Sequence, residues 1–330
     1  MRFYNHILFF LLFSIFIFQA CDDPDVGLYK PIIFEQKSGF PGSGRASAVA
    51  FAINGKGYVT LGRVNSNSKD TLTYLWEYTP ETDSWTKKKS FPGKSRVKGI
   101  AAVVNGKAYV GLGFAGNAVV FSEFLGDFWS YNPLINEWTA LAGFPGNDTD
   151  GCFCFVLDNQ IYVGSGYSHL SMNKNLWSYN TMTNTWKQLN DLTGDARFGS
   201  IGCSDGIRAY YGTGFKAVNM NDWWEYNLLE DKWKKRRSMP DKGRVNGIAL
   251  SVSNRFFATT GRYFNGMYNG GKVLSDIYEY DPDKNKWHNR GEVPGGGREN
   301  AVSFVIGSKV YIGFGENDTT VLNDMYSFEP

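Results

Sequence analysis

The chain alternates short apolar segments with turn residues, and the pattern recurs along most of its length. In the second copy, residues 96–104 are mostly apolar and small and are followed by Asn105 and Gly106, a pair typical of hairpin turns. Residues 107–113 form a second apolar segment. Residues 127–131 alternate polar and aromatic side chains with a period of two, which predicts a half-buried strand. A fourth segment begins at Glu137 and ends at Pro145. Each copy therefore predicts four antiparallel strands.

This unit occurs six times at a spacing of about 50 residues, which indicates a repeat architecture. In five copies a Trp follows a Tyr by seven residues: Tyr78 and Trp85, Tyr131 and Trp138, Tyr179 and Trp186, Tyr226 and Trp233, Tyr280 and Trp287. The sixth copy stops after Phe328, before its Trp segment. Near the other end, Phe34 precedes Phe40 by six residues, as Trp85 precedes Phe91. We therefore expect the N-terminal segment to complete the last unit and to close a ring.

Two further features recur in every copy. A glycine ends the second segment: Gly62, Gly113, Gly166, Gly214, Gly261 and Gly315. An aromatic pair marks the third segment, as in Trp129 and Tyr131. As a set these motifs resemble the Kelch repeat, over residues 31–330. The resemblance implies an all-β fold, a six-bladed β-propeller with four antiparallel strands per blade. Nine of the ten Trp residues fall on two repeat positions, so we interpret them as core.

The N-terminus has the pattern of a targeting segment. Residues 7–18 are apolar apart from Ser14, too few to span a bilayer comfortably, which predicts a signal peptide over residues 1–20. Residues 18–21 resemble a bacterial lipobox, although Phe18 stands where Leu is typical. The resemblance implies lipidation of Cys21, with an acidic tether over residues 21–30, similar to the export tags of bacterial surface lipoproteins. We expect a lipid-anchored protein of the cell envelope, in the outer membrane, facing the surface or the periplasm. Ordinary secretion is the alternative.

Composition narrows the function classes. The net charge is +2, which gives no sign of a nucleic-acid partner. Besides Cys21 the chain has Cys152, Cys154 and Cys203, an odd number at repeat positions that otherwise hold small residues. We interpret them as packing residues. No Gly-rich phosphate loop opens a helix. We expect a monomer without a cofactor or a metal.

An arginine recurs thirteen residues before the aromatic of the second segment: Arg45, Arg96, Arg197, Arg244 and Arg298. In the third copy Asp150 stands one residue nearer to that aromatic. Because these residues begin the innermost strand of the resembled fold, they are expected around one mouth of the channel. A ring of guanidiniums would bind a carboxylate or a phosphate. The alternative is that each arginine caps carbonyls of its own inter-blade loop and has a scaffold role.

The residues that follow the second-segment glycines should face the same mouth. They are Arg63, Phe114, Tyr167, Phe215, Arg262 and Glu316. We select Arg63, Arg262, Tyr167 and Phe215 as ligand-binding candidates with the five repeated arginines. The loops beyond them vary in length and carry Asn, Gly and aromatic residues, which suits sugar binding. We therefore expect a non-catalytic module that binds a glycan or an envelope protein at the mouth.

Two enzyme families of related fold allow a catalytic function to be tested against the residues of this chain. The copper oxidases acting on galactose need two His ligands, whereas this chain has only His6, His169 and His288. His6 lies in the targeting segment and His288 on an outer strand, so this chemistry is not expected. The six-bladed Kelch epimerase that interconverts anomers of N-acetylneuraminate needs no metal. This is the alternative function, with Glu316 and Asp150 as candidate acid and base.

Overall fold

The computed structural model describes residues 29–64, 72–117, 120–146, 149–168, 171–266 and 270–330. The predicted signal peptide, Cys21 and His169 lie outside these residues. Residues Pro31–Pro330 form one compact unit built from β-strands. The described residues include no helix that is long and apolar enough to cross a membrane.

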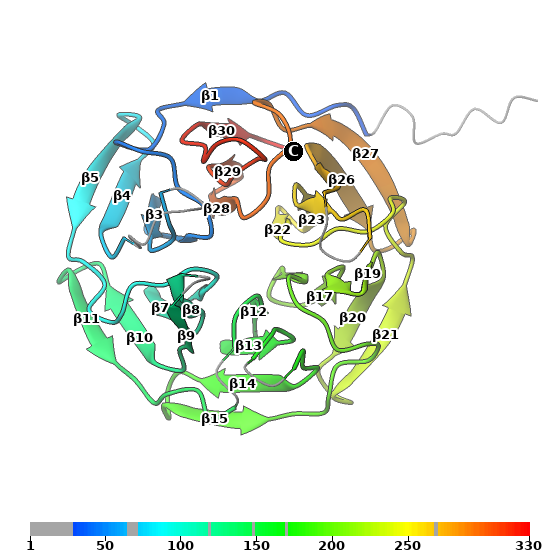
Figure 1. Cartoon of the computed structure of the whole chain (residues 1–330), viewed down its shortest axis with the longest axis horizontal. Helices are drawn as coiled ribbons and strands as arrows, with labels where there is room; N and C mark the ends of the chain where they lie inside the picture. Colours follow the sequence, from blue (N-terminus) through cyan, green and yellow to red (C-terminus); the bar gives the residue numbers. More distant parts are fainter. Residues whose placement is uncertain (1–28, 65–71, 118–119, 147–148, 169–170, 267–269) are drawn as a thin grey trace, which may run out of the picture. The chain divides into compact units, whose positions relative to one another are not determined.

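Six sheets of four antiparallel strands are arranged around a central channel, as Figure 1 shows. Blade 1 contains β2 (Val49–Ile53), β3 (Lys56–Thr60), β4 (Leu75–Thr79) and β5 (Ser84–Lys88). Blade 2 contains β6 (Ile100–Val104), β7 (Lys107–Gly111), β10 (Phe128–Asn132) and β11 (Glu137–Ala140). Blade 3 contains β12 (Phe153–Leu157), β13 (Gln160–Gly164), β14 (Leu176–Asn180) and β15 (Thr185–Gln188).

Blade 4 contains β16 (Ile201–Ser204), β17 (Ala209–Gly212), β20 (Trp223–Asn227) and β21 (Lys232–Arg236). Blade 5 contains β22 (Ile248–Val252), β23 (Arg255–Thr259), β26 (Asp276–Asp281) and β27 (Lys286–Glu292). Blade 6 contains β28 (Val302–Ile306), β29 (Lys309–Gly313), β30 (Met325–Phe328) and β1 (Glu35–Lys37). Small hairpins extend three blades: β8 (Phe114–Asn117) with β9 (Val120–Phe124), β18 (Phe215–Lys216) with β19 (Val218–Asn219), and β24 (Arg262–Tyr263) with β25 (Lys272–Val273).

The ring closes through a strand from the N-terminal side of the unit. Strand β1 pairs antiparallel with β30, with Gln36 opposite Tyr326, and it forms the outer edge of blade 6 (Figure 1). Phe34 packs edge-on against Phe328, with 5.1 Å between ring centroids. The predicted all-β, six-bladed propeller and its closure by the N-terminal strand are therefore confirmed.

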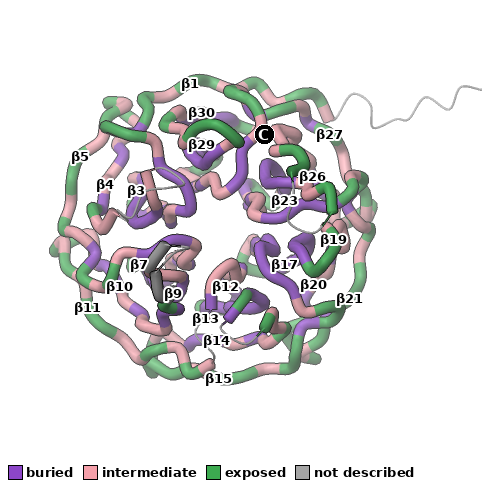
Figure 2. Tube along the Cα trace, in the orientation of Figure 1, coloured by how far each residue is buried: buried purple, intermediate pink, exposed green. Residues whose placement is uncertain are grey.

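The recurring spacing of Tyr and Trp has a structural cause at each junction between blades. In blade 2 the hydroxyl of Tyr131 donates to the side-chain oxygen of Asn136 (2.8 Å), which also accepts the backbone amide of Lys89 from the preceding connection (3.0 Å). The indole of Trp138 donates to the carbonyl of Lys89 (3.0 Å). Tyr, Asn and Trp together thus fasten one blade to the next. Figure 2 shows that exposed residues gather on the outermost strands.

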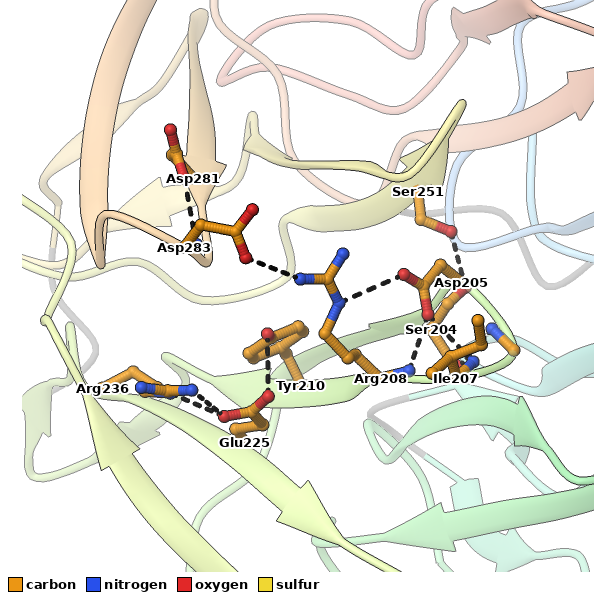
Figure 3. A network of polar contacts seen from close by, with 11 residues as sticks. Ser204, Asp205, Ile207, Arg208, Tyr210, Glu225, Arg236, Ser251, Asp281 and Asp283 are labelled. Carbon is orange, nitrogen blue, oxygen red and sulfur yellow. Dashed lines mark hydrogen bonds and ion pairs between the residues drawn. The ribbon is translucent and has the colours of Figure 1, made fainter.

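Polar contacts also join neighbouring blades on the face that carries the turns between the first and second strands and between the third and fourth strands of each blade. Between blades 4 and 5, Arg208 pairs with Asp205 of its own hairpin and with Asp283 of the next blade, 3.4 Å each (Figure 3). The Ser251 hydroxyl donates to the carbonyl of Ser204 (2.5 Å). Within blade 4, Glu225 is paired with Arg236 and accepts the hydroxyl of Tyr210.

The three described cysteines are unbridged and lie on the innermost strands or at their start. Cys203 is buried in the core, and Cys152 and Cys154 pack against the core between blades 2 and 3. Burial raises the pKa of each thiol, to about 12 for Cys154. A buried, protonated thiol is a poor nucleophile, in agreement with a packing role.

Candidate functional site

The chain forms the same backbone bridge at the start of every innermost strand. A residue just before that strand pairs with the residue after the second-strand glycine: Ala46 with Arg63, Val97 with Phe114, Asp150 with Tyr167, Phe198 with Phe215, Val245 with Arg262, and Glu299 with Glu316. Since the six bridges are equivalent positions of a ring, they surround one mouth of the channel. This mouth is the candidate site.

In each blade, the residue that directly follows the bridge residue before the innermost strand lines the opening. These six residues, Ser47, Lys98, Gly151, Gly199, Asn246 and Asn300, all have a left-handed backbone, with φ between 53° and 63°. Backbone hydrogen bonds link neighbouring blades here, for example from Ser47 to Asn300 and from Asn300 to Asn246 (2.9 and 3.0 Å). Together with the residue that follows each of them, the six residues line a cavity of about 140 Å³. The mouth therefore has a hydrogen-bonded rim, and its side chains vary from blade to blade.

The five repeated arginines do not face this opening. All are buried, and four pair with an Asp at the start of the third strand of the same blade: Arg96 with Asp127, Arg197 with Asp222, Arg244 with Asp276, and Arg298 with Asp324. Each of these four also donates to a backbone carbonyl sixteen residues further on. These contacts favour the alternative that the arginines are scaffold residues within their own blades.

The pair in blade 2 illustrates the electrostatics. Arg96 donates to both carboxylate oxygens of Asp127 (2.6 and 2.8 Å), and the indole of Trp129 donates to the same carboxylate (2.7 Å). Burial raises the pKa of Asp127, but the hydrogen bonds from Arg96 and Trp129 outweigh it, so that the pKa lies below its usual value. A bidentate charge-assisted pair of this kind fixes the start of the inner strand against the third strand.

The structure corrects one alignment. In blade 3 the position of the arginine is taken by Thr149, which is buried and donates to the carbonyl of Tyr167 (3.1 Å). Asp150 instead occupies the bridge position, equivalent to Val97 and Glu299. The distance of thirteen residues from Tyr162 and the backbone bridge both assign the arginine position to Thr149, so the charged residue one place nearer is not its equivalent.

A set of charged and amide side chains linked by ion pairs and hydrogen bonds lies at the mouth on blades 5, 6 and 1. We call Arg63, Asn246, Arg262, Glu299, Asn300 and Glu316 the mouth cluster. Glu316 is ion-paired with Arg63 and accepts the side-chain amide of Asn300 (2.8 Å). Glu299 is ion-paired with Arg262 and accepts the side-chain amide of Asn246 (2.8 Å). Both carboxylates are therefore buried and oriented by partners from neighbouring positions of the ring.

The two arginines of the mouth cluster differ in their surroundings. Arg262 also pairs with Asp318 (2.7 Å). Burial lowers the pKa of Arg262, but its hydrogen bonds to Glu299 and Asp318 outweigh this, so that the pKa is raised. Arg63 contacts Glu316 through one terminal nitrogen, while its buried Nε has no hydrogen-bond partner among the described residues. Arg63 thus retains a donor for a further acceptor.

Across the mouth, blades 2–4 offer a different environment. Asp150 is largely enclosed, and burial raises its pKa, with the nearby Lys98 acting in the opposite sense. The Lys98 ammonium lies 5.6 Å from the centre of the Phe198 ring. Tyr167 is 41% exposed beside Asp150, whereas Phe215 is fully buried against Phe198. Among the predicted ligand contacts, Tyr167 is accessible and Phe215 is a core residue.

Sequence reasoning missed four members of this site. Glu299 directly follows Arg298, and Lys98, Asn246 and Asn300 each lie two residues after a repeated arginine. The same register that located the arginines contained these positions. The repeated arginines are the more conspicuous pattern in the sequence, but the residues two positions after them, which differ from blade to blade, line the cavity.

In the described part of the chain, no three His, Cys, Asp or Glu side chains are grouped so that they could hold a metal ion. The structure therefore offers an arrangement of carboxylates, guanidiniums and amides at the mouth. Such groups can bind hydroxyls and anions and can transfer protons.

Comparisons with known proteins agree on the fold. No family model matches the chain. It is 35% identical over 86 residues to the N-acetylneuraminate epimerase of Pasteurella multocida, covering 26% of this chain and 23% of that protein. It is 28% identical over 116 residues to the N-acetylneuraminate epimerase of Escherichia coli O157:H7, covering 35% of this chain and 30% of that protein. The matches thus span less than a third of either relative.

A solved structure entitled "Structure of YjhT" superposes with a TM-score of 0.75 at 20% identity, covering 88% of this chain and 95% of that one. At this identity the similarity shows the fold alone. The predicted propeller fold is in agreement with this similarity.

Proposed function

We propose that the chain binds an acidic sugar at the mouth and accelerates the exchange of its anomers. The observation that carries this proposal is the pair Glu299 and Glu316, two buried carboxylates on directly opposed residues. Opposed residues of a hydrogen-bonded antiparallel pair have Cα atoms about 5.5 Å apart, which is the scale of one sugar ring. The relatives named N-acetylneuraminate epimerase support the same class of substrate.

The proposed reaction needs only proton transfer. One carboxylate removes the proton of the anomeric hydroxyl while a protonated acid donates to the ring oxygen, and the bond between anomeric carbon and ring oxygen breaks. The open-chain carbonyl rotates and the ring closes on the other face, which returns both protons. Asp150, whose pKa burial raises, is the second candidate acid at this mouth. Arg63, whose Nε has no hydrogen-bond partner in the described part of the chain, is suited to hold the sugar carboxylate.

Measurement of anomer exchange by NMR tests the proposal. N-acetylneuraminate is the first probe, and a neutral hexose serves as the control for acidic specificity. We expect exchange cross-peaks to grow with protein concentration for the acidic sugar. An exchange rate equal to that in buffer at saturating protein would contradict catalysis. A higher unfolding temperature of the protein in the presence of the sugar, without faster anomer exchange, would instead favour the non-catalytic glycan-binding module.

Localisation at the envelope is part of the same proposal. A signal peptide with Cys21 as the lipid anchor would place the propeller where exported sugars and envelope proteins occur. Mass spectrometry of the mature protein tests this: the expected N-terminus is an acylated Cys21, and an unmodified N-terminus would contradict the anchor.

A further inference from the structure

Blades 2 and 4 contain a donor pair that shares one carboxylate. In blade 2 these donors are Arg96 and Trp129, and both bind Asp127. In blade 4 Arg197 donates to both oxygens of Asp222, and Trp224 donates to the same group (2.8 Å). The carboxylate thus has three donors in each blade, one from the indole and two from the guanidinium.

Blade 1 keeps both donors but lacks this carboxylate. The equivalents are Arg45 and Trp76, and the residue two before Trp76 is Tyr74 instead of Asp. Tyr74 is 44% exposed, and the ammonium of Lys87 lies over its ring at 3.4 Å. Tyr74 therefore does not neutralise Arg45, since its contact is with an outer-strand lysine.

The donor atoms of both side chains in blade 1 are buried and have no acceptor among the described residues. Arg45 is 1% exposed, and its guanidinium stacks on the ring of Phe40 at 4.2 Å. Its Nε and Nη1, and the Nε1 of Trp76, have no hydrogen-bond partner among the described residues. Burial without a carboxylate lowers the pKa of Arg45 to about 10. Trp76 also packs against Phe40, with 5.7 Å between ring centroids, so both groups lie beside the same ring. Buried donors are normally satisfied, and two unsatisfied ones here indicate an acceptor.

The space beside Arg45 also differs from that of a complete blade. In blade 6 a Cβ placed on Gly295 would lie 2.3 Å from Asp324 Oδ2 and 2.6 Å from Arg298 Nη2. Gly42 occupies the equivalent position in blade 1, and a Cβ there would meet no heavy atom within 4 Å. As far as the described residues show, the region that the pair fills in blade 6 is therefore open next to Gly42.

We propose that blade 1 is a binding site for a small carboxylate, held between the guanidinium of Arg45 and the indole of Trp76. The geometry of blades 2 and 4 shows how one carboxylate satisfies both donor groups at once. Bidentate binding by arginine favours a planar carboxylate over a spherical halide. The ligand is a short organic acid, and acetate is the simplest probe. This site is separate from the mouth cluster and independent of the proposed function.

NMR of the tryptophan indoles tests the site directly. Acetate is titrated at constant ionic strength against chloride, with acetamide as the neutral control, and the Trp76 signal is assigned with Trp76→Phe. We expect a saturable shift of the Trp76 indole. The chain supplies two internal controls. Trp129 is already bound to Asp127. The Nε1 of Trp177 is buried without a hydrogen-bond partner among the described residues, but it lies in blade 3, which has Thr149 in place of the arginine. Neither should respond.

Two variants test whether the acetate response arises at the proposed site. Tyr74→Asp restores the carboxylate of the other blades, and we expect it to abolish the acetate response and to raise the unfolding temperature in the absence of acetate. Arg45→Gln should weaken acetate binding at least tenfold. A Trp76 indole that ignores acetate in the wild type overturns the proposal, as does an unchanged response in Tyr74→Asp. Asp70 precedes Tyr74 by four residues in the sequence and is the nearest other carboxylate before it, so Asp70→Asn is the remaining control. An acetate response that appears only in Asp70→Asn also overturns the proposal.

Discussion

Glu299 and Glu316 exchange two backbone hydrogen bonds, of 2.9 and 3.0 Å, and each carboxylate is held by a different arginine. Glu299 is fixed from blade 5 by Arg262, and Glu316 is fixed from blade 1 by Arg63. The pair therefore lies at a point where three blades meet, with its two carboxylates oriented independently. This relationship is the basis of the proposed proton transfer at the mouth.

Replacement of Glu316 by Gln should remove a proton-transfer group and keep its shape. If Glu316 acts as acid or base, the protein-dependent rate of anomer exchange should fall by about 10²–10⁴-fold. NMR exchange spectroscopy gives the rate. Glu225→Gln is the matched control, because Glu225 is also paired with an arginine, Arg236, but lies in the network of Figure 3. Equal rates for Glu316→Gln and the wild type would exclude the assigned role.

The buried pair in blade 2 should be important for stability and not for ligand binding. Asp127→Ala leaves the fully buried Arg96 without its carboxylate. We expect a loss of roughly 2–3 kcal/mol in the free energy of unfolding, below the range for fully buried pairs because Asp127 is 38% exposed. Denaturant unfolding measures this loss. The exposed pair Lys94 and Glu123 is the control, where Glu123→Ala should cost about 0–1 kcal/mol. Similar losses for the two variants would contradict the scaffold role.

Stability should depend on pH through Asp150. Burial raises the pKa of this carboxyl in the folded state, so the folded protein binds a proton more tightly than the unfolded chain. Stability therefore falls as the pH rises from the unfolded value, about 4, through the raised value. Asp150→Asn stays neutral and should lose this dependence. The unfolding temperature of the variant minus that of the wild type should increase with pH above about 4, and a flat difference would contradict the assignment.

The closure of the ring can be tested on the N-terminal strand. Phe34→Ala removes the contact with Phe328 and should cost about 1–3 kcal/mol of unfolding free energy, less than a fully buried Phe because Phe34 is half-buried. Ile33 precedes it and is 89% exposed, so Ile33→Ala should change stability by less than about 0.5 kcal/mol. Equilibrium unfolding in urea compares the two. An equal effect of both substitutions would mean that the strand contributes no side-chain packing.

The sequence by itself determined the fold, because each strand repeats a local rule. The seven-residue spacing of Tyr131 and Trp138 reflects a fixed set of contacts with Asn136 and the preceding blade, so it recurs between the third and fourth strands of five blades. The glycines and the unfinished sixth copy followed from the same register. Phe34 could be assigned to the last blade because its distance from Phe40 matches the rule.

The tertiary structure decided what the repeated charges do. The sequence contained Arg96 and Asp127 and their equivalents in other blades. Whether a guanidinium faces the channel or a carboxylate of its own blade depends on how the strands pack, because Arg96 and Asp127 are 31 residues apart in the chain. The same packing brought Glu299, Glu316, Arg63 and Arg262 to one side of the mouth, from three different blades. Among the described residues, it also left the buried donors of Arg45 and Trp76 without a carboxylate. Position in the repeat fixes the backbone, whereas the pairing of charges is set by which side chains meet in space.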